Sequence, residues 1–208
     1  MFNSFASLTG TLKSVAFSRP LAQSLGRNRT RMDRELELIW ESIEAWPITS
    51  SVKGGSVFNS GALVSDIEIF EREIGVTLPE DVKDSFLRHD GMPKENGYYC
   101  FWEGNFLSLN DSLKERNERI RITKEVSGEP GSPDYYPPGN VIGPVKPLIW
   151  SSSWIPVLKK NKEPVCIDFD PAKGGAIGQV IEVDWEGSEV KVIASSYREF
   201  LIKVVENL

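Results

Sequence analysis

Residues 154–185 read WIPVLKKNKEPVCIDFDPAKGGAIGQVIEVDW, and they decide the fold class because apolar and polar residues alternate along them. A period of two is the signature of a β-strand with two distinct faces. The alternation predicts strands over 165–169 and 177–183, and apolar runs predict two more at 154–158 and 190–193. Turns are predicted at 161–164 and 186–187, so the C-terminal third is predicted to be an antiparallel meander.

Helical patterns dominate the chain before this meander. Apolar residues recur at three- and four-residue spacing in residues 36–46, 67–74 and 82–87, which predicts three amphipathic helices. Their ends carry recognisable signals. These are Pro47 after the first helix, a Ser65/Glu68 capping box and Gly75 around the second, and Pro79 and Gly91 around the third.

Two more helices are predicted after Gly91. Asn110 can cap a short charged helix over 111–122, and a Ser196/Glu199 capping box precedes an apolar helical face that runs to Leu208. Aromatic residues in 98–106 favour strand structure between these elements. Helices first, strands later and a closing helix indicate an α+β fold, with N-terminal helices packed on a mostly antiparallel sheet closed by a C-terminal helix.

Residues 128–147 contain ten Gly or Pro among twenty positions, which predicts a long irregular loop. Loops of this length are usually functional or disordered. The segment is therefore either a partner-contact region or a disordered connection.

The charge of the chain is unevenly distributed. Residues 1–31 contain five basic residues and no acidic one. Since the whole chain has a net charge of −6, residues 32–208 carry a net charge of −11. We expect residues 1–31 to be a disordered tail or the product of a start codon upstream of a true initiator at Met32, with a mitochondrial targeting segment as the alternative. Residues 32–208 are expected to form a single domain. The acidic balance argues against a nucleic-acid partner.

The two cysteines, Cys100 and Cys166, lie far apart in apolar segments, which favours reduced thiols and a cytoplasmic location over a disulfide framework. No run approaches the roughly 18 apolar residues that a membrane span requires. The sequence therefore predicts no membrane span.

Candidate chemistry is sparse in this sequence. The single histidine, His89, offers the only imidazole base, and neither cysteine sits in a nucleophile-type turn. Asp168 and Asp170 form an Asp-x-Asp pair that can hold a divalent metal, but no third acidic ligand follows at calcium-loop spacing. We favour a turn in which an aspartate accepts hydrogen bonds from the amides of its own loop, with Gly174 and Gly175 at positive φ. No metal and no cofactor are predicted.

Six segments in order resemble one known superfamily: LPEDVK (78–83), FLRHDG (86–91), FLSL (106–109), WIPV (154–157), CIDFDP (166–171) and GQVI (178–181). They are similar to the SUKH superfamily, which includes fungal Smi/Knr-type regulators of cell-wall glucan synthesis and bacterial immunity proteins. The resemblance runs from Leu36 to Leu208 and leaves residues 1–31 uncovered.

The resemblance implies an α+β fold and a non-enzymatic role in binding other proteins. The positions that match the family's marked residues either line a binding groove or hold the fold: Asp90, Gly91, Trp154, Pro156, Asp168, Asp170, Gly178 and Gln179.

Three hypotheses for function follow. The first is an immunity or antitoxin-like inhibitor, or a regulatory adaptor, that binds a protein partner. The second is a fungal-type scaffold that regulates cell-wall assembly and glucan synthase. The third is a metal-dependent hydrolase that uses Asp168 and Asp170.

Overall fold

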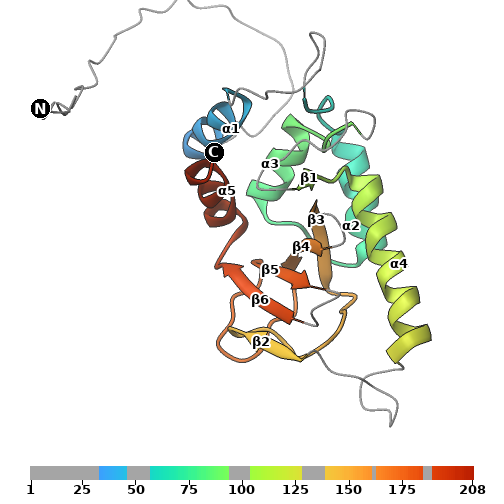
Figure 1. Cartoon of the computed structure of the whole chain (residues 1–208). Helices are drawn as coiled ribbons and strands as arrows, with labels where there is room; N and C mark the ends of the chain where they lie inside the picture. The colour runs from blue at the N-terminus through green and yellow to red at the C-terminus, as the bar shows by residue number, and fades with distance from the viewer. Residues whose placement is uncertain (1–32, 46–56, 94–103, 128–138, 161–162, 185–188) are drawn as a thin grey trace, which may run out of the picture. The chain divides into compact units, whose positions relative to one another are not determined.

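The computed structural model describes residues 33–45, 57–93, 104–127, 139–160, 163–184 and 189–208. In these ranges it contains one six-stranded sheet with the strand order β1-β3-β4-β5-β6-β2 (Figure 1). The predictions for residues 1–31, Trp46, residues 98–102 including Cys100, residues 128–138 and the turn at 186–187 lie outside the described residues.

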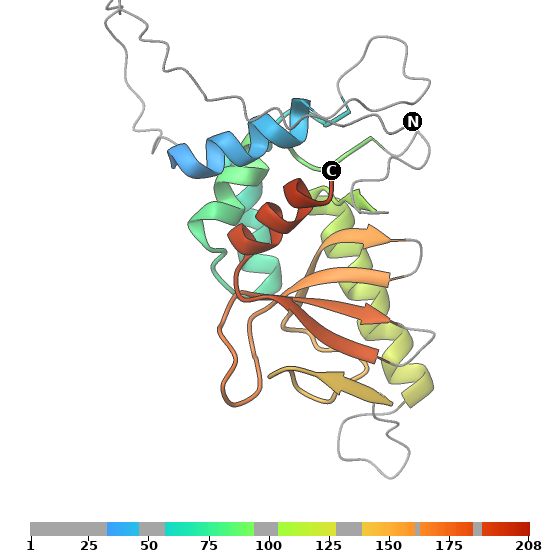
Figure 2. The ribbon, with the colours of Figure 1, turned by 60° about the vertical axis from the view of Figure 1, so that its left-hand side comes forward.

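Four strands form the predicted antiparallel meander, although Phe169 and Ile177, which were predicted to be strand residues, lie outside them. The four strands are β3 (Trp154–Lys160), β4 (Glu163–Asp168), β5 (Gln179–Asp184) and β6 (Glu189–Ala194), each antiparallel to the next (Figure 2). The sheet is extended by β1 (Asn105–Phe106), which pairs antiparallel with β3.

The outermost strand, β2 (Asn140–Ile142), corrects one prediction. It lies within the segment expected to be irregular, and it pairs in parallel with β6. Val141 and Ile142 are β-branched residues that suit a strand, although glycine and proline surround them. Three residues are enough for an edge strand because β6 supplies the partner backbone.

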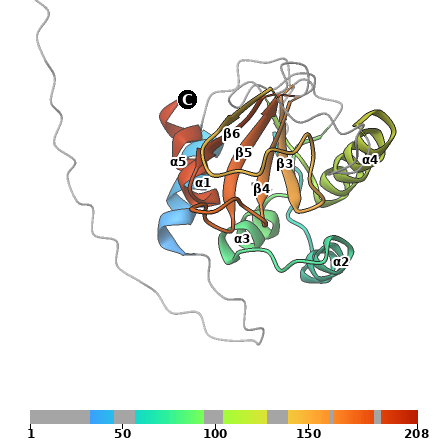
Figure 3. The same ribbon diagram turned by 90° about the horizontal axis from the view of Figure 1, so that it is seen from below.

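Successive side chains of a strand point to opposite faces of the sheet, and the central strands bury side chains on both of them. Val165 and Ile167 of β4 belong to one apolar cluster, and Cys166 between them belongs to the other. Helices α1 (Arg34–Ala45), α3 (Glu80–Arg88) and α5 (Tyr197–Glu206) contribute to the first cluster. The segment from Val145 to Trp150 and Ile120 of α4 contribute to the second cluster. Figure 3 shows α1 and α5 side by side on one side of the sheet and α4 on the other.

Helix α2 (Val64–Ile74) ends as predicted but begins differently. Gly75 follows it in the left-handed conformation with φ of 76°. The predicted Ser65/Glu68 capping box is wrong, because Ser65 already lies inside the helix and the Asp66 carboxylate accepts a hydrogen bond from the Leu63 amide at 3.2 Å. An acidic residue therefore still satisfies a free amide at this helix end.

Helix α4 (Leu109–Ser127) is longer than predicted, and its cap is a different residue. Asn110 lies inside the helix. The Ser108 hydroxyl accepts a hydrogen bond from the Asp111 amide at 3.1 Å, and the Asp90 carboxylate accepts one from the Leu109 amide at 2.7 Å. Because Asp90 lies 19 positions away, local sequence could not reveal this second cap.

The closing helix α5 begins at the predicted cap. The Ser196 hydroxyl accepts a hydrogen bond from the Glu199 amide at 3.2 Å. The Glu199 carboxylate in turn accepts from the Ser195 amide at 2.7 Å, one residue earlier than a standard capping box places it. Among the described helices, none combines the length and the apolar composition that a membrane span needs.

Candidate functional site

Three of the marked residues stand side by side on adjacent strands. Trp154 of β3 is the register partner of Asp168 on β4, and Asp168 is the register partner of Gln179 on β5. All three side chains are buried, and they lie on the face of the sheet that carries Cys166. Pairing of neighbouring strands therefore joins residues from three separate sequence motifs into one row.

Asp168 is the centre of this row. Its Oδ1 accepts a hydrogen bond from the Asp170 amide, and its Oδ2 accepts one from Gln179 Nε2, both at 2.9 Å. Burial raises the pKa of the Asp168 carboxyl, while these two hydrogen bonds oppose the rise. The Trp154 indole lies close enough to the carboxylate to oppose the rise in pKa as well, although its Nε1 lacks hydrogen-bond geometry with any residue in the described ranges.

The loop that follows Asp168 is held by hydrogen bonds from its own backbone. The Gly178 amide donates to the Asp168 carbonyl at 2.8 Å, which closes the loop at its base. Gly174 and Gly178 have φ of 94° and 88°, a region that favours glycine. The turn interpretation of Asp168 and Gly174 is confirmed. Gly175 has no positive φ; a Cβ there would lie 2.6 Å from the Pro144 carbonyl oxygen, so close backbone approach requires that glycine.

A second segment of the chain supports this loop. The Pro144 carbonyl accepts hydrogen bonds from the Ala172 amide and from Gln179 Nε2, both at 3.1 Å. Lys146 forms an ion pair with Asp170, with 2.6 Å between Nζ and Oδ2. Asp168 and Asp170 are therefore engaged separately, one with the Asp170 amide and Gln179 and the other with the half-buried Lys146.

The remaining marked residues lie elsewhere in the fold. Pro156 is in the middle of β3, and its carbonyl accepts a hydrogen bond from the Ser112 hydroxyl of α4 at 2.6 Å. Asp90 caps α4, and the Gly91 carbonyl accepts from the Asn59 amide at 3.0 Å. The structure thus brings Trp154, Asp168, Asp170, Gly178 and Gln179 together, whereas the described contacts of Asp90 and Gly91 join other segments.

The sequence of this chain is similar to that of a known protein family. The model of the SMI1 / KNR4 family (SUKH-1) matches residues 61–203, which includes every marked position. The chain belongs to the SMI1/KNR4 family. The identification made from six short sequence segments is confirmed.

Three fungal relatives are similar to this SMI1/KNR4 chain. The cell wall biosynthesis/cell cycle regulator smi1 of Schizosaccharomyces pombe is 26% identical, and the match covers 81% of this chain and 35% of that protein. The cell wall assembly regulator SMI1 of Saccharomyces cerevisiae is 23% identical, with 84% and 40% covered. The glucan synthesis regulatory protein of Neurospora crassa is 22% identical, with 81% and 37% covered. The chain spans well under half the length of these relatives.

The described part of this SMI1/KNR4 domain offers no group of three or more His, Cys, Asp or Glu side chains suited to a metal ion. His89 and Cys166 do not pair: the His89 ring contacts Glu44 and the Asn59 carbonyl, and the Cys166 thiol is fully buried. Burial raises the pKa of Cys166 well above its ordinary value. A thiol in that state is a poor nucleophile.

Sequence reasoning missed the residues that support the loop from outside. Pro144 and Lys146 lie in the segment predicted to be irregular, and nothing in their local sequence points to Asp170 or Gln179. Ile177 was predicted to be a strand residue, but it precedes β5 and is 75% exposed. The available signal for a loop position was the glycine content around Ile177, with Gly174 and Gly175 before it and Gly178 after it.

Gly91 provides a stability test of the marked residues away from the loop. Gly91 has φ of 69°, and a Cβ there would lie 2.3 Å from the Ser108 amide nitrogen. We expect Gly91→Ala to lower the free energy of unfolding by about 2 kcal/mol, because both the conformation and the close approach would be strained. Urea denaturation would measure this change. Gly75→Ala is the matched control, because Gly75 also has positive φ but nothing lies within 4 Å of its Cβ position. A loss no larger at Gly91 than at Gly75 would contradict the steric argument.

Proposed function

We propose that this chain is a non-enzymatic regulator of cell-wall assembly that acts by binding a protein partner. The observation that carries the proposal is the family membership, together with the names of three fungal relatives as regulators of the cell wall or of glucan synthesis. These names favour the scaffold hypothesis over the immunity hypothesis that the sequence placed first.

The geometry of Asp168 counts against the hydrolase hypothesis. Both of its oxygens accept hydrogen bonds from protein donors, and the side chain is fully buried. Asp170, the second carboxylate of the proposed hydrolase, forms an ion pair with Lys146. Catalysis by a carboxylate requires contact with substrate or with a metal, and both oxygens of the buried Asp168 are already bound to protein donors.

The loop from Phe169 to Gly178 is the proposed contact surface. Ile177 is 75% exposed on it, and Lys173 is exposed without an ion pair to any described residue. The hydrogen bonds to Asp168 and Pro144 hold the loop in one conformation before binding, which reduces the entropy lost on association. A partner with an apolar pocket bordered by acidic groups fits this pair of side chains.

Affinity capture with paired variants tests the proposal. The intact chain, Ile177→Asp and Ile69→Asp would each be used to capture proteins from the source cells. Ile69 of α2 is 50% exposed, so its variant controls for the loss of an exposed isoleucine. We expect Ile177→Asp to reduce the amount of each specific partner captured by at least about tenfold, since a charge would enter an apolar pocket. Ile69→Asp should capture the same amount as the intact chain.

Two outcomes would contradict the proposal, each in a different part. Equal capture by Ile177→Asp and the intact chain would remove the loop as the contact surface. A toxin domain as the specific partner, in place of wall-synthesis or wall-integrity proteins, would overturn the cell-wall role and restore the immunity hypothesis.

A further inference from the structure

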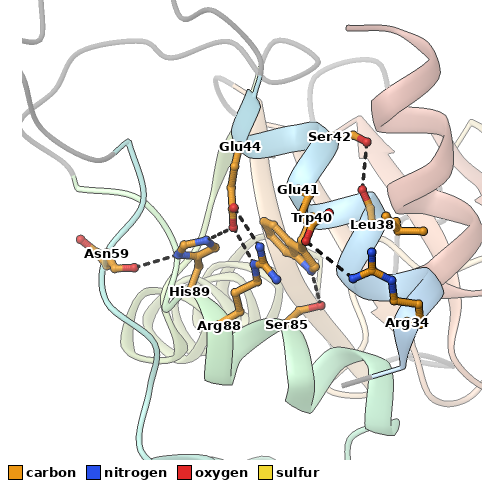
Figure 4. A network of polar contacts seen from close by, with 10 residues as sticks. All are labelled: Arg34, Leu38, Trp40, Glu41, Ser42, Glu44, Asn59, Ser85, Arg88 and His89. Carbon is orange, nitrogen blue, oxygen red and sulfur yellow. Dashed lines mark hydrogen bonds and ion pairs between the residues drawn. The ribbon is translucent and has the colours of Figure 1, made fainter. Parts of the chain in front are cut away.

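Helix α1 is attached to the rest of the domain by a polar cluster at its C-terminal end. The helix precedes residues 61–203, the range that the family model matches. Its apolar face packs into the first core cluster, and Trp40 Nε1 donates a hydrogen bond to the Ser85 hydroxyl at 2.9 Å. Figure 4 shows that Glu44, near the end of the helix, points toward Arg88 and His89.

Both ring nitrogens of His89 face oxygen atoms that can only accept hydrogen bonds. Nε2 lies 2.6 Å from Glu44 Oε1, and Nδ1 lies 3.1 Å from the Asn59 carbonyl oxygen. Arg88 binds the same carboxylate through Nε and Nη2, at 2.6 and 2.8 Å. The hydrogen bonds from Arg88, and to a lesser extent from His89, hold the pKa of Glu44 below its ordinary value, so Glu44 stays ionised.

We propose that His89, Glu44 and the Asn59 carbonyl form a proton-controlled clamp that fastens α1 to the domain. A protonated imidazole donates from both nitrogens and satisfies both acceptors. A neutral imidazole has a single N–H, so one of the two contacts then places a nitrogen lone pair against an oxygen lone pair. The clamp is complete only when His89 carries a proton.

The surroundings of His89 limit which other groups take part. The Phe58 ring stacks on the imidazole with 4.6 Å between centroids, and the Trp40 ring lies at 5.5 Å. The charged groups nearest to the imidazole are Glu44 of α1 and Arg88 of α3. Glu37 and Glu41 of α1 also interact with Arg88. Asp90 follows His89 in the chain, but its carboxylate is bound to the Leu109 amide. Arg88 keeps its contact with Glu44 at any pH that leaves the carboxylate ionised, so we expect α1 to loosen rather than to dissociate.

The sign of the effect follows from the donors. A doubly protonated imidazole holds both acceptors and a neutral one holds only one, so we expect α1 to be held more firmly at pH 5.5 than at pH 8.0. Amide hydrogen exchange of residues 34–45 in the full chain, corrected for intrinsic rates, would measure this. Between pH 5.5 and 8.0 we expect the opening of α1 to increase by about fivefold, while amides of β4 and β5 keep their protection. Since His89 is the only histidine in the chain, a ring ¹⁵N titration reports its protonation without ambiguity.

Three variants make the clamp falsifiable. His89→Gln and Glu44→Gln should abolish the pH dependence of α1 exchange. Glu41→Gln, which makes the same change one turn away in a residue bound to Arg34, should retain it. The clamp would be overturned by α1 exchange in the intact chain that is independent of pH, or by an equal pH dependence in His89→Gln.

Discussion

Replacement of Trp154 by alanine is expected to lower the free energy of unfolding by ~3–5 kcal/mol, the largest effect of any single substitution proposed for this chain. Trp154 is fully buried, and its ring meets Trp150 edge-on with 5.8 Å between centroids. Alanine would leave a cavity at the end of the sheet beside Asp168, which the strand backbones on either side cannot close. Chemical denaturation followed by circular dichroism would measure the loss.

A phenylalanine at the same position separates packing from hydrogen bonding. Because Trp154 Nε1 forms no hydrogen bond with any residue of the described part, Trp154→Phe should cost only about 1–2 kcal/mol. If Trp154→Phe were as destabilising as Trp154→Ala, the indole nitrogen would have a role that the packing argument does not contain.

Replacement of Asp168 by alanine is expected to have the second largest effect, a loss of ~2–4 kcal/mol. The substitution removes the acceptor of the Asp170 amide and one of the two acceptors of the Gln179 side chain. The loop from Phe169 to Gly178 should become the first part of the domain to exchange its amide hydrogens. Asp168→Asn keeps the size and one acceptor, so its loss should be intermediate.

The pH dependence of stability provides a second measurement on Asp168. Burial raises the pKa of this carboxyl in the folded protein, so the folded state holds the proton more tightly than the unfolded state. The contribution of Asp168 to the free energy of unfolding is therefore greatest below about pH 4, the ordinary pKa of an aspartate. It falls as the pH rises through the higher pKa that Asp168 has in the folded state. Other acids also titrate here, Asp84 and Asp90 in the same sense and Glu182 in the opposite one, so the quantity to compare is the difference between variants. We expect a shallower decline in Asp168→Ala between pH 4 and 7. Parallel profiles would show that Asp168 does not titrate as its burial requires.

Local periodicity was sufficient to predict the meander and the helices. Val165 and Cys166 point to opposite faces of the sheet because a strand has a period of two. Each face is apolar and packs into its own core cluster. Gly75 ends α2 because only a residue that tolerates positive φ can occupy that position without strain. Such signals act over a few residues and can be read from one sequence.

The errors arose where distant segments decide the outcome. Asp90 caps the N-terminus of α4 from a position 19 residues earlier in the chain. Pro144 binds Gln179, 35 residues later, and so holds the loop before β5 in which Ile177 lies. The marked residues were identified by resemblance, but their arrangement was not, because Trp154, Asp168 and Gln179 meet only through strand register. Their role in partner binding stays a prediction.

The parallel pairing of β2 with β6 has a consequence for how the chain folds. Asn140 pairs with Glu189, 49 positions later, whereas the hairpins between them close over much shorter distances. Closing a long loop costs more chain entropy, and the partner edge of β6 does not exist until the meander has formed. We infer that β2 joins the sheet last during folding and leaves it first during unfolding. The Pro144 carbonyl, two residues beyond β2, then reaches Gln179 and Ala172 only in that final step, so the loop becomes rigid when the sheet is complete.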